Sequence, residues 1–344
     1  MPQDWNQRLK TAYKRSGREP HRPVRLPAEG VMSVAGDADH AVIDLESGAI
    51  VRNMQDNAAA FEGWSLALRH WCGAEKVTLR WQPPVVPLVL KKDDLVRERH
   101  YQRFLYRVER FSSLFNWFDV ATPDLFARWR HLYNKEYFLN VAGNGPNTPS
   151  DEVAESSMAK PEYDLECRLQ TDPDFHKHYK FAREALIDRQ FPVGLFSEAT
   201  PTAASAVFPG GKGAIDLVCL DHRHLWLFEL KAEKNIPIGT IAELLFYGSV
   251  MRDAVMGKFK FGRIAGGRAK VRPEMLGQVN EITGVMLGHD LHPLISDPKL
   301  IGLLNNAVEN QWNCIDGAPL VSFRADKIQE DQKDRPLKIV ECGR

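Results

Sequence analysis

Residues 213–231 read GAIDLVCLDHRHLWLFELK and contain two apolar runs joined by a polar turn near residues 221–223. This pattern predicts two neighbouring β-strands. Alternation along the second run places Glu229 and Lys231 on one face of its strand, and Asp216 interrupts the first apolar run. Because an unpaired charge is costly to bury, charged residues in such apolar strands indicate a functional site.

The three charged residues of this stretch form a candidate hydrolytic site. If the strands pair as a hairpin, Asp216 lies close to Glu229, and two carboxylates at one point suit a hard divalent cation such as Mg²⁺. Such a cation polarises a phosphodiester and lowers the pKa of a bound water. A neighbouring lysine, here Lys231, can orient or deprotonate that water and stabilise charge on the phosphate. These groups are a minimal set for phosphodiester hydrolysis.

The segments around this strand pair predict an α/β fold with a mixed central sheet flanked by helices. Before the pair, we expect a helix over residues 174–190 and a strand over residues 191–198. After the pair, the predicted order is a helix, a strand, a helix and two closing strands. These elements are expected over residues 236–257, 281–290, 297–310, 318–326 and 337–342.

The pattern GAIDLV followed by FELK resembles the PD-(D/E)xK superfamily of nucleases. Asp216 and Glu229 are 13 positions apart, a spacing typical of the strand pair in that superfamily. The residue before Asp216 is Ile215, where the family's name has proline. The resemblance covers residues 170–310 and implies a restriction-endonuclease-like fold. It also implies that Asp216 and Glu229 hold Mg²⁺ or Mn²⁺, while Lys231 assists the attacking water.

The resemblance implies two further glutamates. Many members of the superfamily place Gln and Tyr four residues apart on a later helix, as in Q-L-x-x-Y. This chain has E-L-L-F-Y there, with Glu243 and Tyr247 on one helical face. Two roles stay open for Glu243, namely metal binding through water and packing beside the site. Many members also carry a glutamate on the first helix, for which Glu184 is the candidate and Glu198 its competitor.

The chain divides into four predicted segments. Residues 1–30 are rich in Arg, Lys and Pro and predict a flexible basic arm. Residues 31–145 predict an N-terminal α+β domain of unknown role. Residues 146–164 belong to a stretch rich in Gly, Pro, Asn and Ser, which indicates a linker. Residues 165–344 then form the predicted nuclease domain.

Within the N-terminal domain we expect a hairpin over residues 40–53, a helix over 57–73 and a strand over 76–82. A following helical segment, residues 101–118, carries aromatic and aliphatic residues at three- and four-residue steps. This stripe predicts a core face, and a base-stacking platform is the alternative. A second helix is expected over residues 121–139.

A basic, glycine-rich stretch after the long helix of residues 236–257 is the candidate nucleic-acid interface. Its cations are interleaved with aromatic residues, and no acidic residue lies among them in the sequence. Such a segment can follow a phosphate backbone, whereas the alternative is an ordinary solvated loop. The cations are Lys258, Lys260, Arg263, Arg268, Lys270 and Arg272.

Composition restricts the class of protein. Lys plus Arg (45) balance Asp plus Glu (45), which weighs mildly against a protein that coats nucleic acid by charge alone. The five cysteines form no C-x-x-C pair, so no disulfide framework or zinc ribbon is expected and a reducing, cytoplasmic compartment fits best. No uninterrupted apolar stretch of about 18 residues occurs, so no membrane span is expected.

These observations predict a magnesium-dependent endonuclease that hydrolyses DNA in restriction, repair or defence against foreign DNA. DNA is the expected partner, and a homodimer is favoured because one site cuts one strand. The sequence has no G-x-x-x-x-G-K-[ST] loop, so an ATPase or helicase would be a partner subunit. Two alternatives stay open. One is a catalytically silent nucleic-acid-binding or assembly subunit with the same fold, and the other is a hydrolase of RNA or of a nucleotide.

Overall fold

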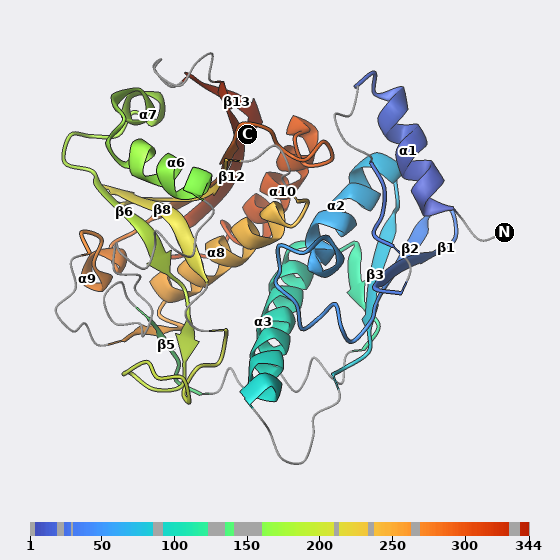
Figure 1. Cartoon of the computed structure of the whole chain (residues 1–344), viewed down its shortest axis with the longest axis horizontal. Helices are drawn as coiled ribbons and strands as arrows, with labels where there is room; N and C mark the ends of the chain where they lie inside the picture. The colour runs from blue at the N-terminus through green and yellow to red at the C-terminus, as the bar shows by residue number, and fades with distance from the viewer. Residues whose placement is uncertain are drawn as a thin grey trace. The chain divides into compact units, whose positions relative to one another are not determined.

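The computed structural model describes residues 4–18, 24–28, 30–84, 92–122, 135–140, 160–209, 213–232, 237–262, 269–329 and 338–343. The chain forms two compact units (Figure 1). The first comprises Met1–Lys135, Pro237–Glu243 and His292–Ala307, and the second comprises Glu136–Ile236, Leu244–Leu291 and Val308–Arg344. The predicted domains are continuous in sequence, but the first unit includes two short segments from the second half of the chain.

The N-terminal helix α1 (Trp5–Arg15) belongs to the first unit. Trp5, Leu9 and Tyr13 recur at every fourth position and are buried, so one face of α1 packs into the unit. The prediction of a flexible arm over residues 1–30 is therefore wrong for this helix. Most of the basic residues of α1 are exposed, so their abundance marks a solvated helix face and not disorder.

The first unit contains a four-stranded sheet with the order β1-β2-β3-β4. Its strands are β1 (Met32–Gly36), β2 (His40–Leu45), β3 (Lys76–Trp81) and β4 (Phe118–Val120). β1 and β2 are antiparallel, whereas β2–β3 and β3–β4 are parallel pairs. Between these strands lie η1 (Asn57–Ala59), α2 (Phe61–Cys72) and α3 (Lys92–Leu114). Parallel strands that alternate with helices are an α/β arrangement, so the predicted α+β class is wrong for this unit.

The predicted hairpin over residues 40–53 is displaced in the structure. β2 ends at Leu45, and its antiparallel partner is the preceding strand β1. The chain turns after Gly36, whose φ of 117° is accessible mainly to glycine. Asp37 then supports the turn, because its Oδ1 accepts a hydrogen bond from the backbone N–H of His40 at 2.9 Å.

Aromatic side chains of α2 and α3 form the core of the first unit. The Phe61 ring makes edge contacts with Phe104 and Phe111, at centroid distances of 5.6 and 5.7 Å. The predicted apolar stripe of α3 is buried throughout, which confirms it as a core face. Its members are Tyr101, Phe104, Leu105, Val108, Phe111, Leu114 and Phe115. Beside this stripe, Arg107 and Glu62 form a buried ion pair, with Nη2 2.5 Å from Oε2.

The second unit is built on a six-stranded sheet with the order β13-β12-β11-β9-β8-β6. Its strands are β6 (Leu186–Pro192), β8 (Ala214–Asp221), β9 (His224–Lys231), β11 (Glu281–Gly288), β12 (Leu320–Gln329) and β13 (Lys338–Gly343). β9, β11 and β12 are parallel, whereas β6, β8 and β13 run antiparallel to their neighbours. The sheet is mixed and flanked by helices, which confirms the predicted α/β class at this level.

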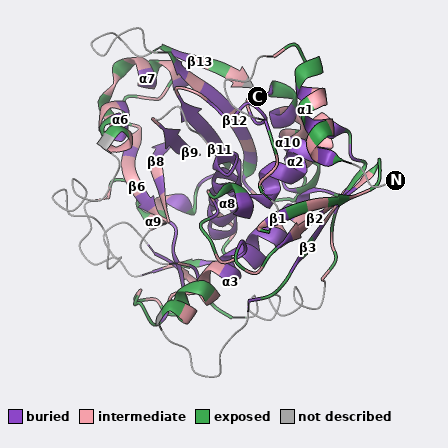
Figure 2. Cartoon of the chain, turned by 45° about the vertical axis from the view of Figure 1, so that its right-hand side comes forward, coloured by how far each residue is buried: buried purple, intermediate pink, exposed green. Residues whose placement is uncertain are grey.

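Helices cover both faces of this sheet. They are α6 (Lys160–Thr171) and α7 (Pro173–Tyr179) on one face and α8 (Thr240–Val255) on the other. Leu169 of α6 and Phe175 of α7 join a buried core with Phe228 of β9. α8 approaches the opposite face closely, because Gly284 of β11 leaves room for Leu244. β9, β11 and α8 are buried along most of their lengths (Figure 2).

Shorter elements complete the two units. A three-stranded sheet with the order β10-β5-β7 lies in the second unit and consists of β5 (Phe138–Leu139), β7 (Leu195–Phe196) and β10 (Lys260–Phe261). The remaining helices are α9 (Pro273–Leu276) and α10 (Pro298–Gln311). Of the helix predicted over residues 121–139, residues 123–134 lie outside the described residues, and its end forms β5 instead.

The helix predicted over residues 174–190 is wrong beyond Tyr179. α7 ends there because Lys180 adopts a left-handed conformation with φ of 58°, and its backbone N–H bonds back to the carbonyls of α7. Residues Leu186–Pro192 form the strand β6, which pairs with β8. Long-range pairing therefore overrides the helical spacing of the local sequence.

We predict that Gly284→Ala destabilises the second unit. An added Cβ would lie 2.8 Å from Phe323 Cδ1 and 3.0 Å from Leu244 Cγ, so tightly packed side chains must shift. Overpacking of this kind costs about 1–3 kcal/mol, which lowers the urea midpoint of unfolding.

Gly302→Ala on α10 is the matched control for this variant. Nothing lies within 4 Å of the added Cβ, so the change should stabilise the helix by about 0.5–1 kcal/mol. A Gly284→Ala protein as stable as the Gly302→Ala protein would contradict the close packing of α8 on the sheet.

Candidate active site

β8 and β9 bring the three sequence-predicted residues together. Their backbone pairing extends to Leu217↔Phe228 and stops there. Beyond that point the carboxylate of Asp216 lies between the strands, and its Oδ2 accepts a hydrogen bond from the backbone N–H of Leu230 at 2.7 Å. On β9, Lys231 Nζ donates to Glu229 Oε1 at 2.6 Å. Glu229 and Lys231 are buried, whereas Asp216 is partly exposed.

Helix α6 adds two glutamates that the sequence analysis does not identify. Glu166 is fully buried, and Glu162 Oε1 lies 3.9 Å from Lys231 Nζ. The two residues share one face of α6 by their four-residue spacing, which is the signal that the sequence offers for them. Glu162 lies within the predicted linker over residues 146–164, and Glu166 lies just after it. Residues 146–159 lie outside the described residues, whereas residues 160–164 belong to α6, so the linker prediction is wrong for them. We call Glu162, Glu166, Asp216 and Glu229 the carboxylate cluster.

Gln190 of β6 connects two members of the carboxylate cluster. Its Nε2 lies 2.8 Å from Glu166 Oε1 and 3.4 Å from Asp216 Oδ1, and it donates to both. The backbone of Gln190 has φ of 52°, which is uncommon for a residue other than glycine. The flanking residues Arg189 and Phe191 both pair with β8. This local distortion of the edge strand is a feature often found at functional sites.

The carboxylate cluster is electrostatically strained. Burial, followed by repulsion from Asp216, raises the pKa of Glu166 from 4.5 to about 8, whereas the hydrogen bond from Gln190 and the charge of Arg189 oppose the shift. Burial also holds the pKa of Asp216 well above its ordinary range, with repulsion from Glu229 as the next cause and attraction to Lys231 opposing both. Lys231 lies beside Glu162, Asp216 and Glu229, and Arg189 attracts Glu166, so two cations face four carboxylates. A further cation would relieve the remaining repulsion.

The donor types of the cluster fit a hard divalent cation. Among the described residues, no group of three or more His, Cys, Asp or Glu side chains is already arranged to hold a metal ion. However, the buried Oε2 of Glu166 has no hydrogen-bond partner in the described part of the chain. A buried oxygen without a partner is costly, and carboxylate oxygens are the ligands that Mg²⁺ prefers. Glu166, Asp216 and Glu229 are the candidate ligands for such a cation by their chemistry, although they do not form a metal-binding group in the described part of the chain.

The other predicted glutamates lie elsewhere. Glu184 is on an exposed turn, 69% exposed and 3.7 Å from His222 Nε2, so its assignment to the first helix is wrong. Its competitor Glu198 is exposed as well. Glu243 is buried at the start of α8 and accepts a hydrogen bond from Gln55 Nε2 at 2.6 Å within the first unit. The catalytic role of Glu243 stays a prediction.

Acidic residues near in sequence or from other segments pair with the predicted nucleic-acid-binding cations. Lys258 lies 3.2 Å from Asp253, and Lys260 lies 2.5 Å from Glu136. Arg272 lies 3.8 Å from a carboxylate oxygen of Glu274. Burial raises the pKa of the Asp188 carboxyl, and the backbone N–H groups of Val271 and Lys270 and the charge of Lys270 oppose this shift. Arg263 and Arg268 lie outside the described residues. The phosphate-binding role of this stretch stays a prediction, and these carboxylates would compete with phosphate for its cations.

Comparisons with protein-family models, with curated proteins and with solved structures found no match for this chain. Within the described residues, no helix combines the length and the apolar character needed to cross a membrane. The functional assignment therefore depends on the chemistry of the carboxylate cluster.

We predict that Glu166→Gln stabilises the metal-free protein at alkaline pH and has little effect at pH 4. Glu166 has a pKa of about 8 in the folded chain and an ordinary value of 4.5. Folding therefore favours the neutral carboxyl. Its contribution to the stability of the fold is fully present below pH 4.5 and is lost as the pH rises through 8. Glutamine keeps the neutral form at every pH. The measurement is the difference in unfolding midpoint between variant and wild type across pH, in EDTA.

Glu184→Gln is the matched control, because its side chain is 69% exposed. It should shift the midpoint little at any pH. A Glu166→Gln effect that does not depend on pH would show that burial does not perturb this carboxyl.

Proposed function

We propose that the second unit is a metal-dependent nuclease that hydrolyses DNA phosphodiester bonds. The observation that carries this proposal is the convergence of Glu166, Asp216, Glu229 and Lys231 at the point where β8 and β9 separate. The mixed sheet with helices on both faces is compatible with the restriction-endonuclease-like fold that the sequence pattern implies.

Each group of the site has a role in this reaction. Glu166, Asp216 and Glu229 would hold Mg²⁺ or Mn²⁺, which when bound polarises the phosphodiester and lowers the pKa of water. Lys231 is placed by its 2.6 Å hydrogen bond to Glu229, so its ammonium can orient the attacking water and stabilise charge on the phosphate. Gln190 restrains the carboxylates of Glu166 and Asp216.

The proposed substrate and partners follow the sequence analysis. DNA is the proposed substrate, cut internally, and the basic stretch from Lys258 to Arg272 is the proposed backbone contact. A homodimer would let two such sites cut both strands. The biological setting that we propose is restriction, repair or defence against foreign DNA.

A second candidate function is a catalytically silent nucleic-acid-binding or assembly subunit. The Lys231–Glu229 ion pair favours this second function, because the Lys231 ammonium already neutralises the Glu229 carboxylate, which a metal ion would need as a ligand. The two functions differ in whether the carboxylate cluster binds a divalent cation.

We predict metal-dependent cleavage of DNA by the wild-type chain and its loss in two variants. Asp216→Asn removes a proposed metal ligand, and Lys231→Met removes the group that acts on water and phosphate. Each should lower the cleavage rate by about 100-fold or more. The measurement is cleavage of plasmid, linear duplex and single-stranded DNA with Mg²⁺ or Mn²⁺, beside RNA of the same sequence.

Lys327→Met is the matched control for Lys231→Met. Lys327 lies on β12 of the same sheet and pairs with Asp290 at 3.4 Å, so the change also breaks a lysine–carboxylate pair. It should leave cleavage within about twofold of wild type, as surface substitutions usually do. Isothermal titration with Mg²⁺ and Mn²⁺ separates the two functions. If the chain binds nucleic acid but neither binds metal nor cleaves, the proposal of a nuclease is wrong and the catalytically silent subunit is the better assignment.

A further inference from the structure

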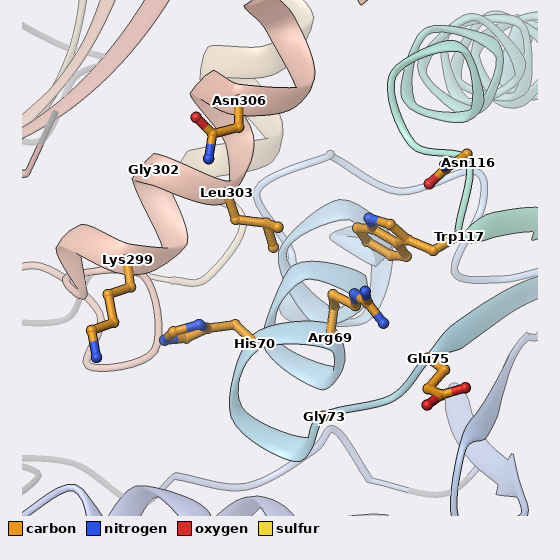
Figure 3. Close-up of a pocket in the computed structure, with 10 residues that line it drawn as sticks. All are labelled: Arg69, His70, Gly73, Glu75, Asn116, Trp117, Lys299, Gly302, Leu303 and Asn306. Carbon is orange, nitrogen blue, oxygen red and sulfur yellow. The ribbon is translucent and has the colours of Figure 1, made fainter. Parts of the chain in front are cut away.

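The first unit has a pocket of about 1020 Å³ that is separate from the carboxylate cluster (Figure 3). Three segments line it, namely the end of α2, the chain between α3 and β4, and the first turns of α10. All of its lining residues belong to the first unit. The volume lies at the upper end of the range of about 300–1,000 Å³ that is common for small-molecule sites.

The lining residues combine an aromatic ring, cations and amides. Among the described residues that line the pocket, Arg69 and Lys299 are permanent cations, and Glu75 is the one carboxylate. The Trp117 ring and the Leu303 side chain supply apolar surface, and Figure 3 shows both turned toward the space around Arg69. The amides of Asn116 and Asn306 complete the lining. The pocket therefore offers one flat apolar surface beside a net positive charge.

The groups of the pocket are held in place by the surrounding structure. The partly exposed Trp117 ring packs against Phe115 at a centroid distance of 4.7 Å. The Arg69 guanidinium lies 5.8 Å from the Trp117 ring, and its Nη1 donates to the carbonyl of Ala74 at 2.7 Å. A pre-positioned ring and guanidinium lower the entropic cost of binding a ligand.

His70 is also restrained in this pocket. Its Nε2 lies 3.3 Å from Asp297 Oδ2, at the N-terminus of α10. The same carboxylate accepts from the backbone N–H of Lys299 at 2.9 Å, so the start of α10 and the end of α2 are tied together. The backbone of Lys299 is thereby held near the end of α2, which carries Arg69.

We propose that this pocket binds a nucleotide through its base and its phosphate, either as a free nucleotide or as one unit of a single strand. Base stacking needs accessible aromatic surface, which the partly exposed Trp117 ring supplies beside Arg69 without preference for one base. Arg69 and Lys299 supply positive charge for the phosphate. Asn116 and Asn306 can donate to and accept from the polar edge of a base. The proposal is independent of the proposed nuclease activity.

Gly302 gives a way to close the pocket without removing any of these groups. A Cβ added at Gly302 meets open space, so a larger side chain would extend into the cavity. Gly302→Phe therefore fills the pocket, whereas Gly302→Ala leaves it open. This pair tests the pocket even if Trp117→Leu were to perturb the aromatic packing around it.

The experiment measures binding to the full chain in EDTA, where a metal-dependent nuclease is inactive. The probes are a short fluorescein-labelled oligodeoxythymidine strand, an abasic strand of equal length, and adenosine and thymidine monophosphates as competitors. Trp117→Leu and Gly302→Phe should each weaken binding by about 5- to 100-fold. Lys299→Met should lower the slope of log affinity against log salt concentration by about 0.7. Gly302→Ala and the exposed control Lys14→Met should match wild type.

The outcomes separate the two sources of nucleotide. Competition by the monophosphates supports a free-nucleotide site, and binding of the strand alone, weakened by the pocket variants, supports a single-strand site. Equal binding of the abasic strand would overturn the proposal, because stacking on Trp117 would play no part. Strand binding that Trp117→Leu and Gly302→Phe leave unchanged, or no binding of any probe, would overturn it as well.

Discussion

The separation of β8 from β9 beyond Leu217↔Phe228 is the constraint on which the carboxylate cluster depends. Where the backbone ladder stops, the N–H of Leu230 donates to the carboxylate of Asp216 in place of a backbone carbonyl. A buried N–H must be satisfied, so this bond fixes Asp216 between the strands while the sheet stays intact on the β11 side. Glu229 and Lys231 then lie beside Asp216 because they belong to the same strand end.

The same arrangement is unfavourable for the metal-free fold. Burial and mutual repulsion favour the neutral forms of Glu166 and Asp216, so ionising them at neutral pH opposes folding. A cation that binds the folded chain and not the unfolded chain would offset this cost and would stabilise the fold by mass action. Metal affinity should therefore rise as these carboxyls lose their protons, and metal binding would link the stability of the second unit to the ion that the proposed chemistry needs.

The sequence predicts the strands of the central sheet better than the residues that surround the site. β8 and β9 follow from their apolar runs, and the charges within those runs are enough to single out Asp216 and Glu229. The sequence does not single out Glu166, because the helix that carries it begins beside a polar stretch. Glu184 is a wrong candidate, because the helix expected to carry it ends at Tyr179. The φ of 52° at Gln190 arises from pairing with β8, which local sequence does not encode. Each unit is assembled from segments that are distant in sequence, so the bounds of the units depend on tertiary contacts that the local sequence does not show.

A second buried carboxylate of the same unit, Asp326, provides a comparison for the carboxylate cluster. Asp326 is also buried, and the hydroxyl of Tyr179 donates to it at 2.8 Å. Arg324 lies 3.1 Å from Asp326 and 3.5 Å from Glu341, so these two carboxylates share one cation. The carboxylate cluster gathers four carboxylates, with Lys231 beside Glu162, Asp216 and Glu229 and with Arg189 acting on Glu166. Apolar replacement of buried charges is often neutral or stabilising, so a chain without a use for these charges would be at least as stable without them. Keeping them in excess is a cost to stability of the kind that functional sites carry.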